Sequence, residues 1–191
     1  NHSTGKMGMA LAAECQRRGA KVTLVCGPTS VQAPASVLVV KVKTAAEMYD
    51  ACNKVFDESD IAIMSAAVAD YSVENPAAKK IKKDGNNLDL SLVKTKDILK
   101  SLGERKKPHQ LLVGFALETN NEKENALKKL NGKNADFIVL NSLQDEGAGF
   151  GHDSNKITIF DRSGNEFRFE AKPKTEVATD IINTILANKH A

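Results

Sequence analysis

Tryptophan is absent from this chain of 191 residues, and only two tyrosines occur in it. Proteins that bind single-stranded nucleic acids stack the bases on aromatic side chains, and this sequence offers little of that surface. The formal net charge is only +3. Local lysine clusters within a mild overall charge suit a small anionic ligand better than a nucleic-acid track. We therefore expect no nucleic-acid partner.

Long apolar runs and paired cysteines are also missing. No stretch reaches 18 consecutive apolar residues, so we expect no membrane span and no membrane partner. The three cysteines, Cys15, Cys26 and Cys52, are odd in number and have no paired spacing. Such cysteines are typical of structural thiols in a reducing compartment. These features predict a cytoplasmic protein.

Motifs for several kinds of catalysis are absent. The four histidines are scattered, and no His-x-x-x-His or Cys-x-x-Cys motif occurs, so we predict no metal site built by the protein itself. No Ser/His/Asp set, reactive-cysteine pattern or close carboxylate pair indicates nucleophilic hydrolysis. The remaining donors are backbone amides, lysines and side-chain amides. They suit phosphoryl or nucleotidyl transfer, where positioning and charge neutralisation supply most of the rate.

Apolar strands alternate with helices along most of the chain, which predicts an α/β fold: a Rossmann-like, mostly parallel sheet flanked by helices. We expect one domain over residues 1–191, with a small β-hairpin appendage at 155–170 that turns at Asp161–Asn165. Because a strand normally precedes a glycine loop of this kind, we expect the domain to lack its first strand in the sequence given. The core strands are expected at 21–26, 37–42, 61–64, 110–115 and 136–140.

Ser3, Gly5 and Gly8 have the spacing of a dinucleotide-type glycine loop that runs into a helix over residues 6–18. Such a loop lets phosphates approach bare backbone at a helix N-terminus, although the same pattern also occurs in simple tight turns. A dinucleotide site needs an acidic residue at the end of the second strand. The residues there are Cys26-Gly-Pro-Thr29, which disfavours a nicotinamide-dependent dehydrogenase.

Three further stretches carry ligand-binding chemistry. Small residues at Ser65–Ala69 would let a flat ligand approach the backbone, and Asp70 offers a carboxylate for a ribose or a magnesium ion. The cluster of four lysines at 79–83 would neutralise a triphosphate, although these lysines could instead simply be exposed to solvent. Lys129 and Lys133 share one helix face and could bind one anion, or simply face solvent.

Seven stretches in order resemble the phosphopantothenoylcysteine synthetases, the family that forms the synthetase domain of the bacterial bifunctional decarboxylase/synthetase. The resemblance covers almost the whole chain, and its combination of motifs is specific. The matching stretches are Asn1-His-Ser-Thr-Gly-Lys-Met-Gly8, Ser65-Ala-Ala-Val-Ala-Asp-Tyr71, Lys80-Ile-Lys-Lys83, Gly114-Phe-Ala-Leu-Glu-Thr119, Lys129 with Lys133-Asn-Ala-Asp136, Asn141, and Phe150 with Asn155.

This resemblance implies a phosphopantothenate–cysteine ligase of coenzyme A biosynthesis. The carboxylate of 4′-phosphopantothenate attacks the α-phosphate of CTP, pyrophosphate leaves, and the amine of L-cysteine then attacks the acyl-cytidylate. Mg²⁺ is the implied cofactor. A homodimer is implied too, which we expect to use the 155–170 appendage, as is fusion to or association with a flavin-dependent decarboxylase domain.

The resemblance also assigns roles to residues. It makes Asn1 and Lys80 catalytic, Asn1 in converting the acyl-cytidylate and Lys80 on the triphosphate. Where the family usually has a Pro-containing pair, this chain has Thr95-Lys96. The implied nucleotide-binding residues are Gly5, Gly8, Ser65, Ala66, Asp70, Lys80, Val93, Lys94, Thr95, Lys96, Phe115, Lys129 and Lys133.

Two other functions remain open. One is an NAD(P)-dependent reductase built on the same type of sheet. The other, from a different class, is a non-catalytic nucleotide-binding or assembly domain.

Overall fold

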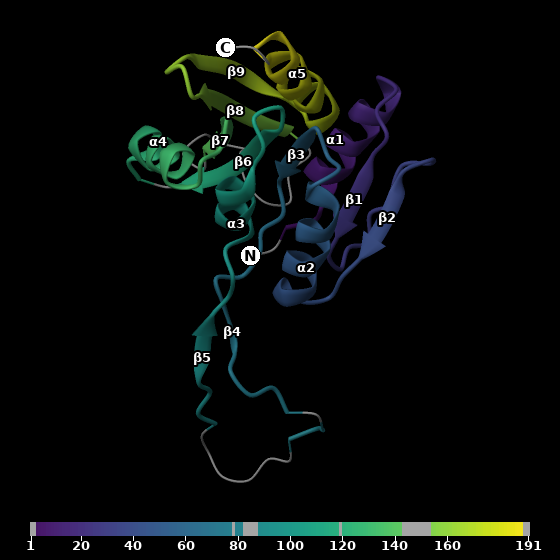
Figure 1. The fold of residues 1–191 in the computed structure, drawn as a ribbon, viewed down its shortest axis with the longest axis vertical. Helices are drawn as coiled ribbons and strands as arrows, with labels where there is room; N and C mark the ends of the chain where they lie inside the picture. The colour runs from purple at the N-terminus through teal and green to yellow at the C-terminus, as the bar shows by residue number, and fades with distance from the viewer. Residues whose placement is uncertain (1–2, 78, 82–87, 119, 143–153, 189–191) are drawn as a thin grey trace.

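The computed structural model describes residues 3–77, 79–81, 88–118, 120–142 and 154–188. Its elements follow one another along the chain as Figure 1 labels them. They are α1 (Lys6–Arg17), β1 (Thr23–Cys26), β2 (Leu38–Lys41), α2 (Ala45–Phe56), β3 (Ile61–Met64), β4 (Tyr71–Val73), β5 (Leu92–Lys94), α3 (Ile98–Arg105), β6 (Leu111–Glu118), α4 (Glu122–Gly132), β7 (Phe137–Ser142), β8 (Ser154–Asp161), β9 (Glu166–Pro173) and α5 (Lys174–Ala187).

The main sheet has the strand order β3-β6-β7-β8-β9. β3, β6 and β7 are parallel, and β8 and β9 continue the sheet in antiparallel fashion. β1 and β2 form a separate parallel pair. Because β3, β6 and β7 run in one direction, their carboxyl ends meet at one edge, and the first residues of the antiparallel β8 reach the same edge. The predicted α/β class with a mostly parallel sheet flanked by helices is confirmed.

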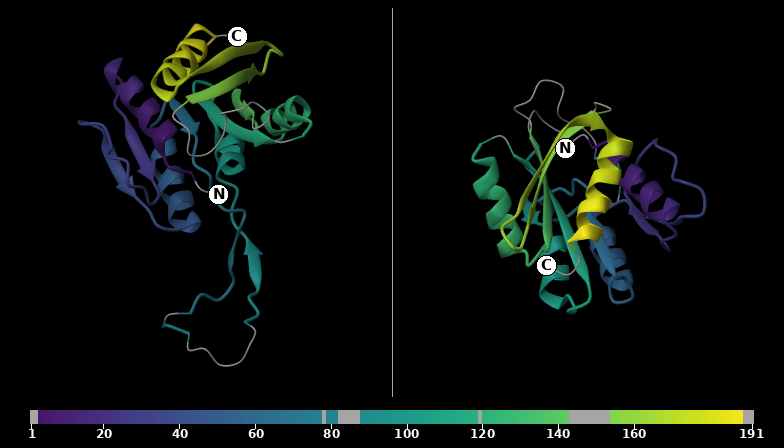
Figure 2. Two further views of the ribbon diagram at one scale, coloured as in Figure 1. Left: turned by 180° about the vertical axis from the view of Figure 1, so that it is seen from behind. Right: turned by 90° about the horizontal axis from the view of Figure 1, so that it is seen from above.

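Helices cover both faces of this sheet, as the view from above in Figure 2 shows. α1 and α5 pack on one face, where Leu11 and the apolar side of α5 contact inward residues of β6, β7 and β8. α2, α3 and α4 pack on the other, around Phe56, Leu102 and Leu130. Strands covered on both faces are apolar throughout, which explains why β6 and β7 read as continuous hydrophobic runs. Within the described residues no helix is both long and apolar enough to cross a membrane.

The hairpin at 155–170 is part of the main sheet. β8 pairs with β7 along its length, from Asn141 opposite Ile157 to Phe137 opposite Asp161, and β9 then pairs with β8. Ile157 and Ile159 are fully buried beneath α5. The sequence predicted the turn and both strands. It did not show their attachment, because pairing with β7 depends on contacts between distant parts of the chain.

β4 and β5 form a two-stranded antiparallel arm that extends away from the body of the molecule (Figure 1). The arm begins at Tyr71, directly after the stretch that follows β3, and returns at Lys94. Several of its side chains are apolar and exposed, among them Leu88 and Leu90.

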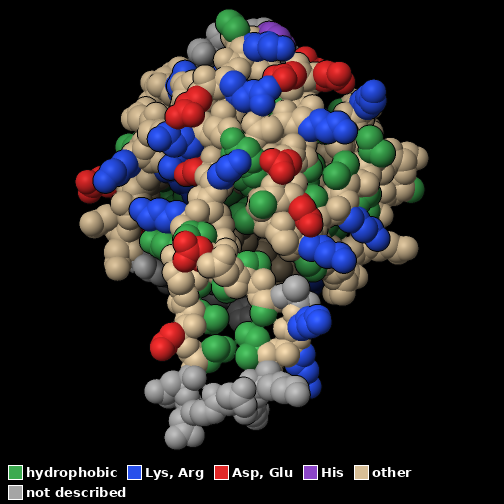
Figure 3. Space-filling model, turned by 60° about the horizontal axis from the view of Figure 1, so that its bottom comes forward, with side chains coloured by type: hydrophobic (Ala, Val, Ile, Leu, Met, Phe, Trp, Pro, Cys, Tyr) green, Lys and Arg blue, Asp and Glu red, His purple; other side chains and the backbone are tan. Residues whose placement is uncertain are grey.

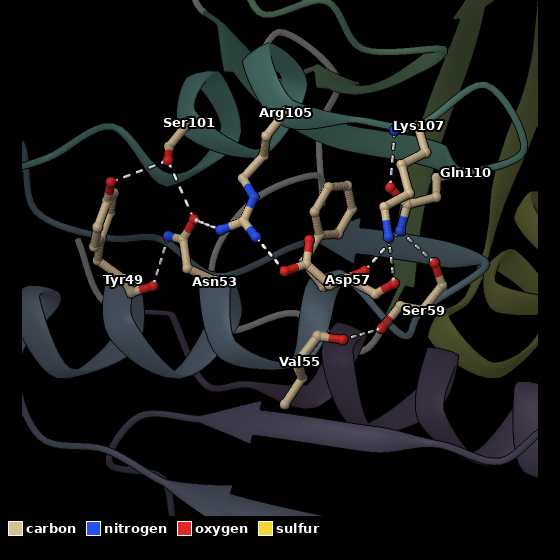
Figure 4. Close-up of polar contacts among 10 residues, drawn as sticks. Tyr49, Asn53, Val55, Asp57, Ser59, Ser101, Arg105, Lys107 and Gln110 are labelled. Atoms are coloured by element: carbon tan, nitrogen blue, oxygen red, sulfur yellow. Dashed lines mark hydrogen bonds and ion pairs between the residues drawn. The ribbon is translucent and has the colours of Figure 1, made fainter.

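A polar network joins α2, α3 and the start of β6 (Figure 4). Gln110, which is only 2 % exposed, donates to the carbonyl oxygens of Phe56 and Ser59 at 2.6 and 2.8 Å and accepts from the Lys107 N–H at 2.9 Å. On α3, Arg105 bonds the side chains of Asn53 and Asp57. Both the oxygen and the nitrogen of the buried Gln110 side-chain amide therefore have hydrogen-bond partners, as a stable interior requires.

Two helical glycines test how closely α3 approaches α4. A Cβ on Gly103 would lie 1.9 Å from the Lys133 carbonyl oxygen, whereas a Cβ on Gly132 would meet nothing within 4 Å. We expect Gly103→Ala to destabilise the protein by about 3 kcal/mol, since backbone must move. Gly132→Ala should stabilise it by about 0.5–1 kcal/mol through helix propensity. Urea unfolding measures both; similar values for the two variants would contradict this packing.

Candidate functional site

A pocket of about 350 Å³ lies at the edge where the parallel strands end. It is lined by the start of α1, the stretch after β3, the second half of β6 and the ends of β7 and β8 that share this edge. Ligands of open α/β sheets bind at this edge. The lining residues are Ser3–Met7, Ser65–Val68, Asp70, Phe115–Leu117, Lys129, Asn141, Asn155 and Lys174.

The glycine loop forms one wall of this pocket. Gly5 has a φ of +79° and precedes α1 without a side-chain cap of its own, while the Lys6 N–H contacts the Thr4 Oγ1 at 3.4 Å. The positive end of the α1 dipole therefore lies at the pocket. A Cβ on Gly8 would lie 3.2 Å from the Ser65 Oγ. Gly8 therefore lets α1 lie directly against the stretch that follows β3, and the two predicted segments meet in space.

A second helix begins at the same pocket. α5 starts at Lys174, which lines the pocket, and Pro173 provides no side-chain cap. Helix N-termini favour anions, so two of them at one pocket reinforce its preference for phosphate or carboxylate groups. The sequence analysis did not assign Lys174 to the site. Pro173 before a helical pattern marks a helix start, but it does not show where that start lies in the fold.

The stretch Ser65–Asp70 is held by the strand that returns from the arm. The Thr95 Oγ1 donates to the Ala69 carbonyl at 2.7 Å, and the Thr95 N–H donates to the Asp70 carbonyl at 2.9 Å. Val93 and Lys94 belong to β5, and the Lys96 Nζ lies over the Tyr49 ring, 4.6 Å from its centre. Residues 93–96 are not among the described residues that line the pocket. Thr95 therefore supports the pocket wall through its hydrogen bonds to the backbone of Ala69 and Asp70.

The two predicted lysines of α4 are placed differently. The Lys129 Nζ donates to the Phe115 carbonyl at 2.7 Å and lines the pocket. Burial lowers the pKa of Lys129, so an anion bound beside it would stabilise its charged form. The Lys133 Nζ instead forms an ion pair with Asp97 at 2.6 Å. The two lysines share a helix face as predicted, but Lys133 is already paired with Asp97, the N-cap residue of α3.

Lys80 lies exposed on the arm and is not among the described lining residues. Asn1 lies outside the described residues, as do Lys82, Lys83, Thr119 and Phe150. The site roles predicted for Asn1 and Lys80 therefore remain predictions. Gly5, Ser65, Ala66, Asp70, Phe115 and Lys129 come together at one pocket, and Gly8 supports it.

Asn141 and Asn155 also line the pocket, near the rim ends of β7 and β8. The sequence analysis noted both residues only as family motifs and gave them no role. Among the parts of the chain that the structure describes, no group of three His, Cys, Asp or Glu side chains could hold a metal ion.

The fold and site define an α/β protein with an anion-binding pocket at the carboxyl edge of a parallel sheet. The chain belongs to the family described as the DNA/pantothenate metabolism flavoprotein C-terminal domain, whose model matches residues 1–188.

Individual relatives agree with this assignment. The chain is 44% identical to the coenzyme A biosynthesis bifunctional protein CoaBC of Bacillus subtilis (strain 168), over 98% of this chain and 46% of that protein. It is 52% identical to a protein named cysteine/cysteine sulfinic acid decarboxylase, from an unknown prokaryotic organism, over 100% of this chain and 53% of that protein. The chain thus spans about half the length of these relatives.

A solved structure gives the same fold. The crystal structure of the C-terminal domain of a CoaBC protein superposes with a TM-score of 0.81 at 38% identity, covering 96% of this chain and 82% of that one.

Thr95 provides a test of how the pocket wall is held. We expect Thr95→Val to loosen residues 65–70, because it removes the 2.7 Å bond to the Ala69 carbonyl. Hydrogen exchange in peptides covering these residues should increase, while the melting temperature falls only slightly, as one exposed bond contributes about 1 kcal/mol. Thr95→Ser keeps the hydroxyl and should exchange like wild type; equal exchange in all three proteins would refute the role.

Proposed function

We propose that this protein is a CTP-dependent phosphopantothenate–cysteine ligase of coenzyme A biosynthesis. One observation carries the proposal: the glycine loop, the Ser65–Asp70 stretch and Lys129, which lie far apart in the sequence, line one pocket. The chain is also 44% identical to a protein named for coenzyme A biosynthesis. The decarboxylase activity in the name of the other relative belongs to a protein about twice as long.

The pocket suits the first half-reaction. The carboxylate of phosphopantothenate attacks the α-phosphate of CTP, and pyrophosphate leaves. Both reactants are anions, so their approach needs positive charge and aligned N–H donors. The starts of α1 and α5 and the Lys129 ammonium supply these at the pocket. Ser65 to Ala67 are small, which leaves room for a nucleotide to lie against the backbone after β3.

Asp70 is the one carboxylate among the described residues that line the pocket. Mg²⁺ commonly binds through one or two carboxylates together with substrate phosphates and water, so the residue fits an ion that arrives with the nucleotide. When bound, the ion would neutralise charge on the phosphates. Asp70 would hold it, and the Thr95 bond to the Asp70 carbonyl would fix the backbone that carries this side chain.

In the second half-reaction the amine of cysteine attacks the acyl carbon, and CMP leaves as the amide forms. We assign Asn1 the stabilisation of the oxyanion that develops during this attack, on the basis of the family motif. Ser3 and Thr4, which follow it, line the pocket.

The other two functions make different predictions. A nicotinamide-dependent reductase would require an acidic residue after β1, where the chain has Gly27-Pro-Thr29. A non-catalytic binding domain would be stabilised by CTP against thermal unfolding but would release no pyrophosphate.

The decisive experiment measures pyrophosphate released from CTP in the presence of phosphopantothenate. The wild-type protein should release it only when both substrates are present. Lys80→Gln should lower the rate on the order of 10²–10³-fold, because neutralisation of the leaving group is lost. Lys79→Gln, its exposed neighbour, should stay within about twofold of wild type. Equal losses in both variants would show a general charge effect instead of a specific contact.

We also propose that the protein forms a homodimer through the arm. Six of the eight large apolar side chains that are exposed among the described residues lie between Tyr71 and Val93. Figure 3 shows apolar side chains gathered along this part of the surface. The 155–170 hairpin, our sequence-based expectation for the dimer contact, has its apolar side chains turned into the sheet core. Burying the arm against a second copy would remove this surface from water.

The dimer proposal predicts the effect of charge on the arm. Wild type and Leu186→Lys, a control on α5, should both sediment as dimers at micromolar concentration. The double variant Leu88→Lys/Leu90→Lys should sediment as a monomer. A dimeric double variant in analytical ultracentrifugation would place the interface elsewhere.

A further inference from the structure

Two asparagine side chains at the pocket each contain a buried oxygen without a hydrogen-bond partner. They are the Oδ1 atoms of Asn141 and Asn155, and the structure gives neither a partner among the residues it describes. Asn155 is only 5 % exposed. Its Nδ2 lies 3.9 Å from the Met7 Sδ, a weak acceptor, so the amide nitrogen faces α1 and the oxygen is left.

This condition is exceptional among the residues that the structure describes. The other buried polar side chains of the described residues have partners: Gln110 with the carbonyls of Phe56 and Ser59, Glu14 with Arg17 and Arg18, Asp161 with Asn165, and Thr184 with the Asp180 carbonyl. A buried acceptor without a donor costs stability. Its retention at a pocket, and nowhere else in the described core, indicates that the donor comes with a ligand.

The side chains of β7 and β8 also change from apolar to polar as the strands approach the pocket. On β7 the residues that face α5 are Phe137, Val139 and then Asn141. On β8 they are Ile159, Ile157 and then Asn155. From Phe137 on β7 and Ile159 on β8 toward the rim, both rows are apolar, and each ends in an asparagine at the rim. Since Asn141 pairs with Ile157, Asn155 is its diagonal neighbour on one face of the sheet.

We propose that Asn141 and Asn155 form a subsite for the hydroxyl-and-amide segment of phosphopantothenate; this assignment rests on the proposed function. Two amide oxygens accept hydrogen bonds, so they select O–H and N–H groups. Ionised phosphate oxygens carry no hydrogen and are excluded. Between its phosphate and its carboxylate, phosphopantothenate carries one secondary hydroxyl and one amide N–H. These are the donors that the two oxygens would bind.

CTP also carries neutral donors, its ribose hydroxyls and its cytosine amino group, and the KM for CTP measured below separates them from phosphopantothenate. The charge of the pocket disfavours the remaining donor, the ammonium group of cysteine. Lys6, Lys129 and Lys174 line the pocket with a single described carboxylate, Asp70. A neutral donor enters such a pocket at lower electrostatic cost than a cation. The subsite therefore binds the hydroxyl-and-amide segment of phosphopantothenate and directs the charged ends of this substrate toward the helix N-termini and the nucleotide.

The test compares KM values in the ligase assay. Asn155→Leu should raise the KM for phosphopantothenate about 10–100-fold, because the substrate donor would enter the pocket unpaired. The KM values for CTP and cysteine should change less than twofold. The melting temperature should stay the same or rise, because a side chain of similar size replaces an unpartnered polar group. Gln110→Leu, the matched control, should lower the melting temperature and leave all KM values unchanged.

A ligand-side experiment gives the same information without relying on the fold of the leucine variant. Two phosphopantothenate analogues are compared with the natural substrate, one without the secondary hydroxyl and one N-methylated at the amide. At least one should raise the KM of wild type tenfold or more. In Asn155→Ala this increase should shrink to less than threefold, because the partner is already gone.

Other results overturn the assignment. An increase in the KM for cysteine alone would make the pair an ammonium site. Unchanged KM values with a lower melting temperature would make Asn155 structural. If wild-type protein releases no pyrophosphate from CTP with phosphopantothenate, the ligase proposal fails and the subsite fails with it. Active wild type with unaffected variants refutes only the subsite.

Discussion

The close contact between Gly8 and Ser65 sets the geometry on which the pocket depends. Because Gly8 has no side chain, α1 begins against the end of β3, and the Ser65 Oγ occupies the space that a Cβ would crowd. This single approach brings a helix N-terminus, the small residues after β3 and the carboxyl ends of β6 and β7 to one place. A bulkier residue would separate the helix from the strand end and open the wall that anions approach.

The two edges of the sheet differ in how far their polar groups are satisfied by hydrogen bonds. At the amino-terminal edge of β6 and β7, Asp136 accepts from the Leu112 N–H at 2.7 Å and pairs with Lys106, and Gln110 uses its amide fully. At the carboxyl edge lie the N-termini of α1 and α5, and two asparagine oxygens there have no described partner. Stability is concentrated at one edge, and the polar groups left for a ligand are concentrated at the other.

The sequence predicted what local patterns determine. The strand at 61–64 and the helix over residues 6–18 follow from local patterns, and both form within one residue of the expected bounds. Contacts between distant segments were beyond those patterns. Spacing put Lys129 and Lys133 on one helix face but could not show that Asp97 holds Lys133. An asparagine in a strand carries no periodic signal, so the roles of Asn141 and Asn155 required the register of β7 and β8.

The arm is anchored in the pocket wall. Its first strand follows Asp70 directly, and its returning strand is followed by Thr95, which donates to the carbonyls of Ala69 and Asp70. A shift of the arm therefore moves the backbone that a ligand must contact. Thermodynamic linkage makes this relation reciprocal: whatever orders residues 65–70 restricts the arm, and whatever grips the arm tightens binding at those residues. Any partner bound at the arm would thereby be coupled to occupancy of the pocket.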